Sequence, residues 1–87
     1  MKKLKVKEIS EGLHRSEVIV SVHTTGGDEG LVLDRRSLQN GYIAVGYPIR
    51  VDGDSYLVEL PRETSSGSWR VWVDGSQLDA APEKEVA

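Results

Sequence analysis

One stretch of the sequence, residues 68–74, limits the possible fold more than any other. Its side chains alternate, with one side formed by Trp69, Val71 and Val73 and the other by Arg70, Trp72 and Asp74. A period of two is typical of a half-buried β-strand. Residues 56–60 form a second apolar run that Pro61 ends, and the polar residues 62–67 join the two runs. The sequence therefore predicts a hairpin at the centre of a small all-β domain.

Further strands are predicted where alternating or apolar runs are bounded by turn residues, over 4–7, 16–24, 30–33, 42–47 and 49–51. In the first of these, lysines alternate with Leu4 and Val6, which predicts an edge strand with its lysines facing water. In the second, Ile19 falls among polar side chains, and we expect another segment or another subunit to cover it. The glycine-rich residues 24–30 contain two acids and no following Lys-Ser/Thr pair, so they predict a hairpin loop rather than a phosphate site.

Two short helical segments are predicted between these strands. Residues 34–41 have the pattern of one helical turn, with the side chain of Asp34 capping its N-terminus and Leu38 as its core anchor. Residues 75–77 predict a short 3₁₀ turn that leads into a buried Leu78.

The order of elements over about residues 42–78 resembles an SH3-like barrel, with a hairpin, the strand at 69–74, a tight turn and Leu78. The predicted fold is all-β, a small SH3-like barrel or roll of five to seven short antiparallel strands with one short helical turn. We expect residues 1–78 to form one domain and 79–87 a flexible tail. The tyrosines lack the spacing and the acidic loop of an SH3 peptide site, so the resemblance implies no ligand.

Composition indicates a thin core and argues against several classes of function. The 87 residues are 38% hydrophobic and include no Phe, and a small core makes oligomerisation an expected source of further burial. The net charge of −3 opposes general affinity for nucleic acid or anionic membranes. The chain has no Cys, and its first residues lack the apolar run of a signal peptide. We therefore expect a cytoplasmic protein that does not enter a membrane.

The leading functional prediction is a protein–protein interaction or adaptor module that associates with itself. Tryptophan, arginine and tyrosine are enriched at the energetic centres of interfaces, so the predicted interaction residues are Trp72, Arg70, Tyr47 and Tyr56, with Ile19 as a second patch. The first alternative is a nucleic-acid-binding barrel that stacks bases on Trp72 beside Arg70. Arg50 and Arg62 are nearby in sequence, and the N-terminal lysines Lys3 and Lys5 would add further contacts. The second is a small-ligand pocket between subunits, lined by Ala44 and Gly46.

Catalysis, metals and cofactors are not predicted. His14 and His23 are nine residues apart and match no zinc spacing, and the acids near residues 28 and 52 lack the calcium-loop pattern. Glu17, Ser21 and His23 share one side of a predicted strand. Alternate side chains on a strand are about 7 Å apart, which is too far for direct proton transfer. We expect a protein that is not an enzyme and holds no cofactor.

Overall fold

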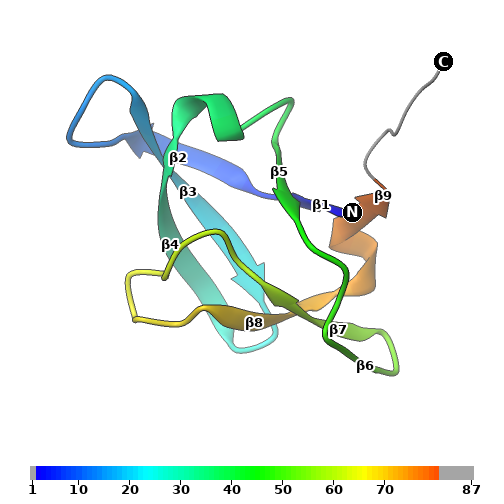
Figure 1. The fold of residues 1–87 in the computed structure, drawn as a ribbon. Helices are drawn as coiled ribbons and strands as arrows, with labels where there is room; N and C mark the ends of the chain where they lie inside the picture. The colour runs from blue at the N-terminus through cyan, green and yellow to red at the C-terminus, as the bar shows by residue number, and fades with distance from the viewer. Residues whose placement is uncertain (1, 81–87) are drawn as a thin grey trace, which may run out of the picture.

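The computed structural model describes residues 2–80 as nine short strands and two 3₁₀ turns (Figure 1). The strands of the first half are β1 (Lys2–Lys5), β2 (Lys7–Glu11), β3 (Glu17–Thr24), β4 (Gly27–Asp34) and β5 (Tyr42–Val45). Those of the second half are β6 (Arg50–Asp52), β7 (Ser55–Glu59), β8 (Arg70–Asp74) and β9 (Leu78–Ala80). The turns are η1 (Arg35–Ser37) and η2 (Gly75–Gln77).

All strand pairs are antiparallel and form three three-stranded sheets, with the orders β5-β1-β9, β2-β3-β4 and β6-β7-β8. The all-β prediction is therefore confirmed. The expected number of five to seven strands is too low for two reasons. The strand predicted near the N-terminus is interrupted at Val6, which separates β1 from β2, and residues of the predicted tail form part of β9. Across residues 2–80 the three sheets do not join into one closed barrel.

The three sheets turn their apolar sides toward one common core. Its fully buried side chains alternate along the strands as the sequence predicts, and the largest of them are Leu4, Val18, Val20, Val22, Leu31, Leu33, Ile43, Val58 and Val73. Leu38, Tyr56 and Leu78 are partly buried against this cluster. The burial of valines on three different sheets makes the core continuous even though no single sheet is wide.

The first strand lies at the centre of its sheet, so its predicted edge position is wrong. β1 pairs with β5 on one side and with β9 on the other. Asp79 and Ala80, which were expected in the tail, pair with Lys3 and Lys2 of β1. The alternation of β1 could not show this, because a central strand with one face in water has the same pattern as an edge strand. The rest of the predicted tail, 81–87, lies outside the described residues.

The β3–β4 hairpin turns more tightly than the sequence predicts. Thr24 pairs with Gly27, so only Thr25 and Gly26 form the loop, and β4 begins three residues before the predicted strand. The buried Thr24 side chain closes the turn, since its hydroxyl accepts a bond from the Gly26 amide at 3.1 Å and donates to the Gly27 carbonyl. Gly27 has a φ of 125°, which its missing side chain permits.

Both predicted helical segments are present as single 3₁₀ turns. The Asp34 side chain accepts a bond from the Arg36 amide at 2.9 Å and caps η1 as predicted. At η2, Asp74 accepts from the Ser76 amide while the Gln77 side chain accepts from the Asp74 amide, which forms a capping box. None of the described residues belongs to a helix long and apolar enough to cross a membrane.

Candidate functional site

The predicted aromatic and basic residues gather in part on one face of the sheet β6-β7-β8. Arg50 lies opposite Leu57, which in turn lies opposite Trp72, so these three side chains form a row on the outer face. Arg70 belongs to the same face, two residues before Trp72 on β8. Trp72 itself is only partly exposed. The structure therefore places the predicted residues Trp72, Arg70 and Arg50 on one face.

Acidic side chains on the same face offset this positive charge. The Arg70 guanidinium lies 3.6 Å from the Glu59 carboxylate on the neighbouring strand. Asp52 and Asp74 belong to the next row of the face, on either side of Ser55. The Asp74 pKa is lowered, chiefly because its carboxylate accepts bonds from the backbone and the hydroxyl of Ser76. This face thus carries acids beside its arginines at neutral pH.

Three of the predicted interaction residues, Tyr47, Tyr56 and Ile19, lie away from this face. Tyr56 points to the opposite side of β7, where it is packed against the core and its ring lies against Gly75. Ile19 lies on the outer face of β3, opposite Val32, and it is partly buried as expected. Ile19 lines a hollow together with the loop after β7, so another segment of the same chain approaches it.

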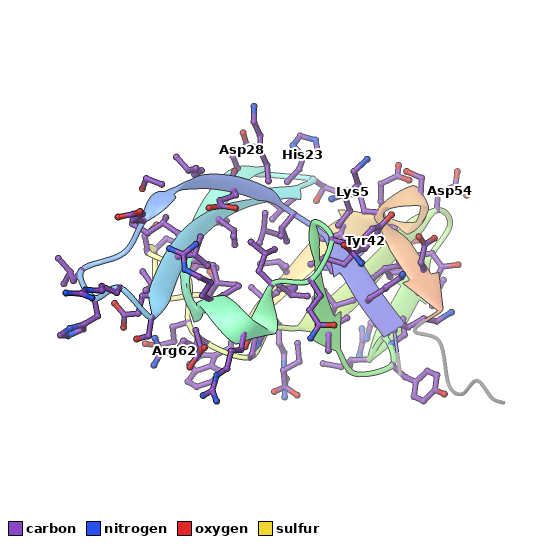
Figure 2. All side chains as sticks on the ribbon, turned by 90° about the horizontal axis from the view of Figure 1, so that it is seen from above. Lys5, His23, Asp28, Tyr42, Asp54 and Arg62 are labelled. Atoms are coloured by element: carbon purple, nitrogen blue, oxygen red, sulfur yellow. The ribbon has the colours of Figure 1, made fainter. Side chains whose placement is uncertain are left out.

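The remaining basic candidates are spread over different sheets. Figure 2 places Lys5 and Arg62 on opposite sides of the molecule. Lys3 lies on β1, where its ammonium group is 4.6 Å from the centre of the Tyr42 ring. The pKa of Tyr42 is raised because its hydroxyl group is hydrogen-bonded to the Asp79 carboxylate, whose negative charge also disfavours ionisation of the tyrosine. Arg62 donates to the Val32 carbonyl on the edge of β4 at 3.4 Å. The structure therefore does not unite these residues with Trp72.

The second tryptophan lies in a different position from the one the alternation predicts. Trp69 was expected on the buried side with Val71 and Val73, but β8 begins only at Arg70, and 51% of Trp69 is exposed. Its indole N–H donates to the Glu63 carboxylate at 2.8 Å, and its carbonyl accepts from the Leu60 amide. These bonds within the loop turn the ring outward, and the sequence contains no clear signal of them.

Tyr47 joins Trp69 at one hollow on the surface. It is a predicted interaction residue at the end of the predicted strand 42–47, but β5 ends at Val45, and 68% of Tyr47 is exposed. The hollow has a volume of about 290 Å³ and is lined by both aromatic residues together with Ala44, Gly46, Glu59 and Pro61. We call it the Tyr47–Trp69 hollow. Ala44 and Gly46, from which we predicted a ligand pocket, both line this hollow.

A second hollow begins where the first one ends. It has a volume of about 550 Å³ and is lined by Lys3, Arg36, Gln39, Asn40 and Tyr42, and it shares Ala44 and Pro61 with the Tyr47–Trp69 hollow. We call it the Arg36–Tyr42 hollow. Because both hollows share Ala44 and Pro61, we call them together the groove beside β5; it also reaches Lys3 on β1.

The backbone of β5 adds a polar edge to this groove. The amide and the carbonyl of Tyr42 both bond to Gln39, so they point away from β1. Backbone groups two residues apart on a strand point the same way, so those of Ala44 also point away from β1. Within the described residues, β1 is the only strand paired with β5. Ala44 therefore presents an N–H and a C=O to the groove.

Within the part of the chain that the structure describes, His23 pairs with Asp28 rather than with Ser21 or Glu17. Nδ1 of His23 lies 2.7 Å from the Asp28 carboxylate across the hairpin, on the same side of the molecule as Lys5 (Figure 2). This partner is on β4, whereas Ser21 and Glu17 are the residues that share the outer face of β3 with His23. Among residues 2–80, no three His, Asp or Glu side chains are close enough together to hold a metal ion.

The chain was also compared with known proteins. No protein-family model, no curated protein and no solved structure matches it.

Proposed function

We propose that this chain is a non-enzymatic protein–protein interaction module, of the adaptor kind, that associates with itself. The observation that carries the proposal is the Tyr47–Trp69 hollow. Its two aromatic side chains are 68% and 51% exposed, whereas Tyr42, Tyr56 and Trp72, the other aromatic residues that the structure describes, are half-buried. Exposed aromatic residues around a shallow hollow are characteristic of the centres of protein interfaces.

Two further features favour a protein partner at this surface. The bond from the indole of Trp69 to Glu63 fixes the ring before any partner arrives, which lowers the entropy lost on binding. The hollow is adjacent to the free polar edge of β5, and such an edge binds an extended segment through backbone hydrogen bonds. A surface that combines aromatic contacts with an open strand edge suits a polypeptide better than a small molecule.

We also propose that the fold is an opened relative of the SH3-like barrel. The three consecutive strands β6, β7 and β8, the turn η2 and a last strand that returns to β1 support this assignment. In this view, the groove between β5 and Pro61 is the place where the barrel is open.

The solution mass of matched variants tests the proposed surface. Tyr47→Ala and Trp69→Ala remove the aromatic walls, so we expect each to weaken self-association at least tenfold, which corresponds to about 1.4 kcal/mol. Leu13→Ala removes a side chain that is 97% exposed in another loop, and it is the matched control. Light scattering over a concentration series measures the effect. A wild-type chain that stays at 9.6 kDa at every concentration would contradict self-association.

Nucleic-acid binding is the second candidate, and the row formed by Arg50, Leu57 and Trp72 favours it. Bases would stack on Trp72, and the arginines would contact phosphates. The acids of the same face oppose this binding, which makes it the weaker proposal. Titration with a single-stranded oligonucleotide tests it. Quenching of the tryptophan fluorescence that weakens as salt is added would favour this candidate, and an unchanged spectrum would exclude it.

A small ligand held between two subunits is a third proposal, since Ala44 and Gly46 line the Tyr47–Trp69 hollow. It predicts that self-association becomes stronger when a ligand is present. Dialysis of the purified protein followed by a second mass measurement tests it, and an unchanged dimer would exclude a required ligand.

A further inference from the structure

We infer that the partner at the free edge of β5 is a second copy of this chain, and that the two β5 strands pair antiparallel about a two-fold axis at Ala44. The inference rests on the proposed function, because it names the partner of the same surface. It also fixes which residues face each other, and so it can fail even where self-association is correct.

The backbone of β5 determines the centre of the pairing. The polar groups of Tyr42 are already bonded to Gln39, so they cannot bond to a second copy. Ala44 is the next residue whose N–H and C=O point into the groove. With the two-fold axis at this residue, the two Ala44 residues exchange a pair of N–H···O bonds. A two-fold interface uses the same surface on both copies, as self-association of identical chains requires.

In the register that follows, the exposed Tyr47 side chain of one copy lies opposite the Arg36–Tyr42 hollow of the other. Around an axis at residue 44, the numbers of facing residues add up to 88, so Ile43 faces Val45, and the pairing ends there because Gln39 already lies beside Tyr42. β5 ends at Val45, so the paired segment of each copy spans residues 43–45 only. The exposed Tyr47 of one copy then reaches the Arg36–Tyr42 hollow of the other, which has a volume of about 550 Å³.

The charges at the two ends of the groove are complementary under the same two-fold axis. Lys3 lines the groove at one end beside Arg36, which is paired with Asp34 at 3.1 Å, and Glu59 lines it at the other end, where Arg70 lies 3.6 Å away. Glu63 adds a second carboxylate beside Trp69 at the acidic end. Antiparallel pairing brings the acidic end of each copy to the basic end of the other. Parallel pairing would place like charges together, which is unfavourable.

A charge-exchange experiment tests the position of Ala44. In Ala44→Lys and in Ala44→Glu, like charges face each other at the axis, so we expect each variant alone to have the monomer mass of 9.6 kDa. In an equal mixture, opposite charges face each other, and we expect the dimer mass to return. Light scattering gives the mass, and circular dichroism verifies that each variant is folded. Dimers in either single variant, or monomers in the mixture, would overturn the inference.

Cross-linking provides a second test with a smaller change. The chain has no Cys, so Ala44→Cys introduces a single thiol that faces its counterpart at the axis. Hydrogen-bonded antiparallel pairs have Cα atoms about 5.5 Å apart, which is within the range that a disulfide spans. Under mild oxidation we expect Ala44→Cys to form covalent dimers at least tenfold faster than Leu13→Cys, whose residue is 97% exposed elsewhere. Equal rates would overturn the inference.

The two levels of the proposal fail in different ways. A wild-type chain that is monomeric at every concentration contradicts both the proposed self-association and the pairing through β5. A wild-type dimer that persists in Ala44→Lys contradicts the pairing alone and leaves the interaction module in place.

Discussion

At the scale of single residues, Gly75 shows how closely the last turn packs against the core. A Cβ atom at this position would lie 2.5 Å from Cε1 of Tyr56 and 3.3 Å from the Asp54 carbonyl oxygen. Neither neighbour moves easily, because the tyrosine ring is packed against the core and the carbonyl accepts the Gly75 amide. The glycine is therefore required for space.

We expect Gly75→Ala to lower the free energy of unfolding by about 1–3 kcal/mol, the usual cost of inserting a methyl group into a packed site. Urea unfolding measures the change. Gly26→Ala is the control, because its nearest heavy atom is 3.9 Å away. Similar losses in both variants would contradict the packing described at Tyr56.

Glu29 links the stability of the loop after β7 to pH. The hydroxyl of Ser66 donates to its carboxylate at 2.6 Å, and this bond, followed by one from Thr64, lowers the pKa of Glu29 below its usual 4.5. A carboxylate with a lowered pKa stabilises the folded state above the pKa of the unfolded chain. This contribution disappears as the pH falls through the pKa of the folded state.

We therefore expect Ser66→Ala to destabilise the protein more at pH 7 than at pH 3. Thermal unfolding across this range measures the difference from wild type, and Ser10→Ala, whose hydroxyl bonds only to a neighbouring carbonyl, is the control. A difference that is the same at every pH would show that Glu29 does not take part.

Single residues also show what the sequence can predict. The alternation of Val18, Val20 and Val22 is sufficient to place them in the core, because one face of a strand is buried as a unit. The same rule fails for Trp69, because it applies only inside a strand, and β8 begins one residue later. The exposed position of Trp69 depends on a bond to Glu63, which is a contact that alternation does not encode.

At the scale of elements, the loop between β7 and β8 is an ordered part of the fold rather than a simple connection. Its Ser65 amide donates to the Gly30 carbonyl at 2.8 Å, and Arg62 donates to the Val32 carbonyl, so the loop covers the outer edge of β4. Thr64 is buried within it, and its hydroxyl accepts a bond from the Ser68 amide at 3.1 Å. Covered edges protect a small β protein from unwanted strand pairing.

We expect Thr64→Val to destabilise the protein by about 1–3 kcal/mol, because the Ser68 amide then lacks a partner away from water. Chemical unfolding measures the loss, and Thr25→Val at the exposed hairpin turn is the control. A neutral result would mean that water replaces the lost hydroxyl and that the loop is less tightly closed than described.

The predicted elements differ from the observed ones mainly where contacts between residues distant in the sequence determine whether a strand or a tight turn forms. The two 3₁₀ turns were predictable from Asp34 and from residues 75–77, since local capping forms them. The strand β9 was not, because it has only three residues and exists through its pairing with β1. The tight turn likewise depends on the Thr24 hydroxyl, which accepts a bond from the Gly26 amide. The composition of the loop does not show which of its residues makes this bond.

At the scale of the whole molecule, three small sheets share one core and leave one side of β5 unpaired within residues 2–80. The sequence predicts a small β domain and a tendency to associate, because its core is thin and because aromatic or β-branched residues occur on both faces of its strands. It also predicts the interaction residues Trp72, Arg70, Tyr47, Tyr56 and Ile19, of which only Tyr47 lines the hollow that carries the proposed function. The predicted face around Trp72 is partly covered, whereas Tyr47 and Trp69 border the groove beside β5.

The exchange rate of the Ala44 amide hydrogen in the wild-type chain tests this account most directly. Its N–H points into the groove, so we expect fast exchange in dilute solution and at least tenfold slower exchange at a concentration where the solution mass has doubled. The Val20 amide, in the middle of a central strand, is the internal reference and is expected to exchange at one rate throughout. An Ala44 amide that exchanges equally fast at both concentrations would contradict the pairing of two copies through β5.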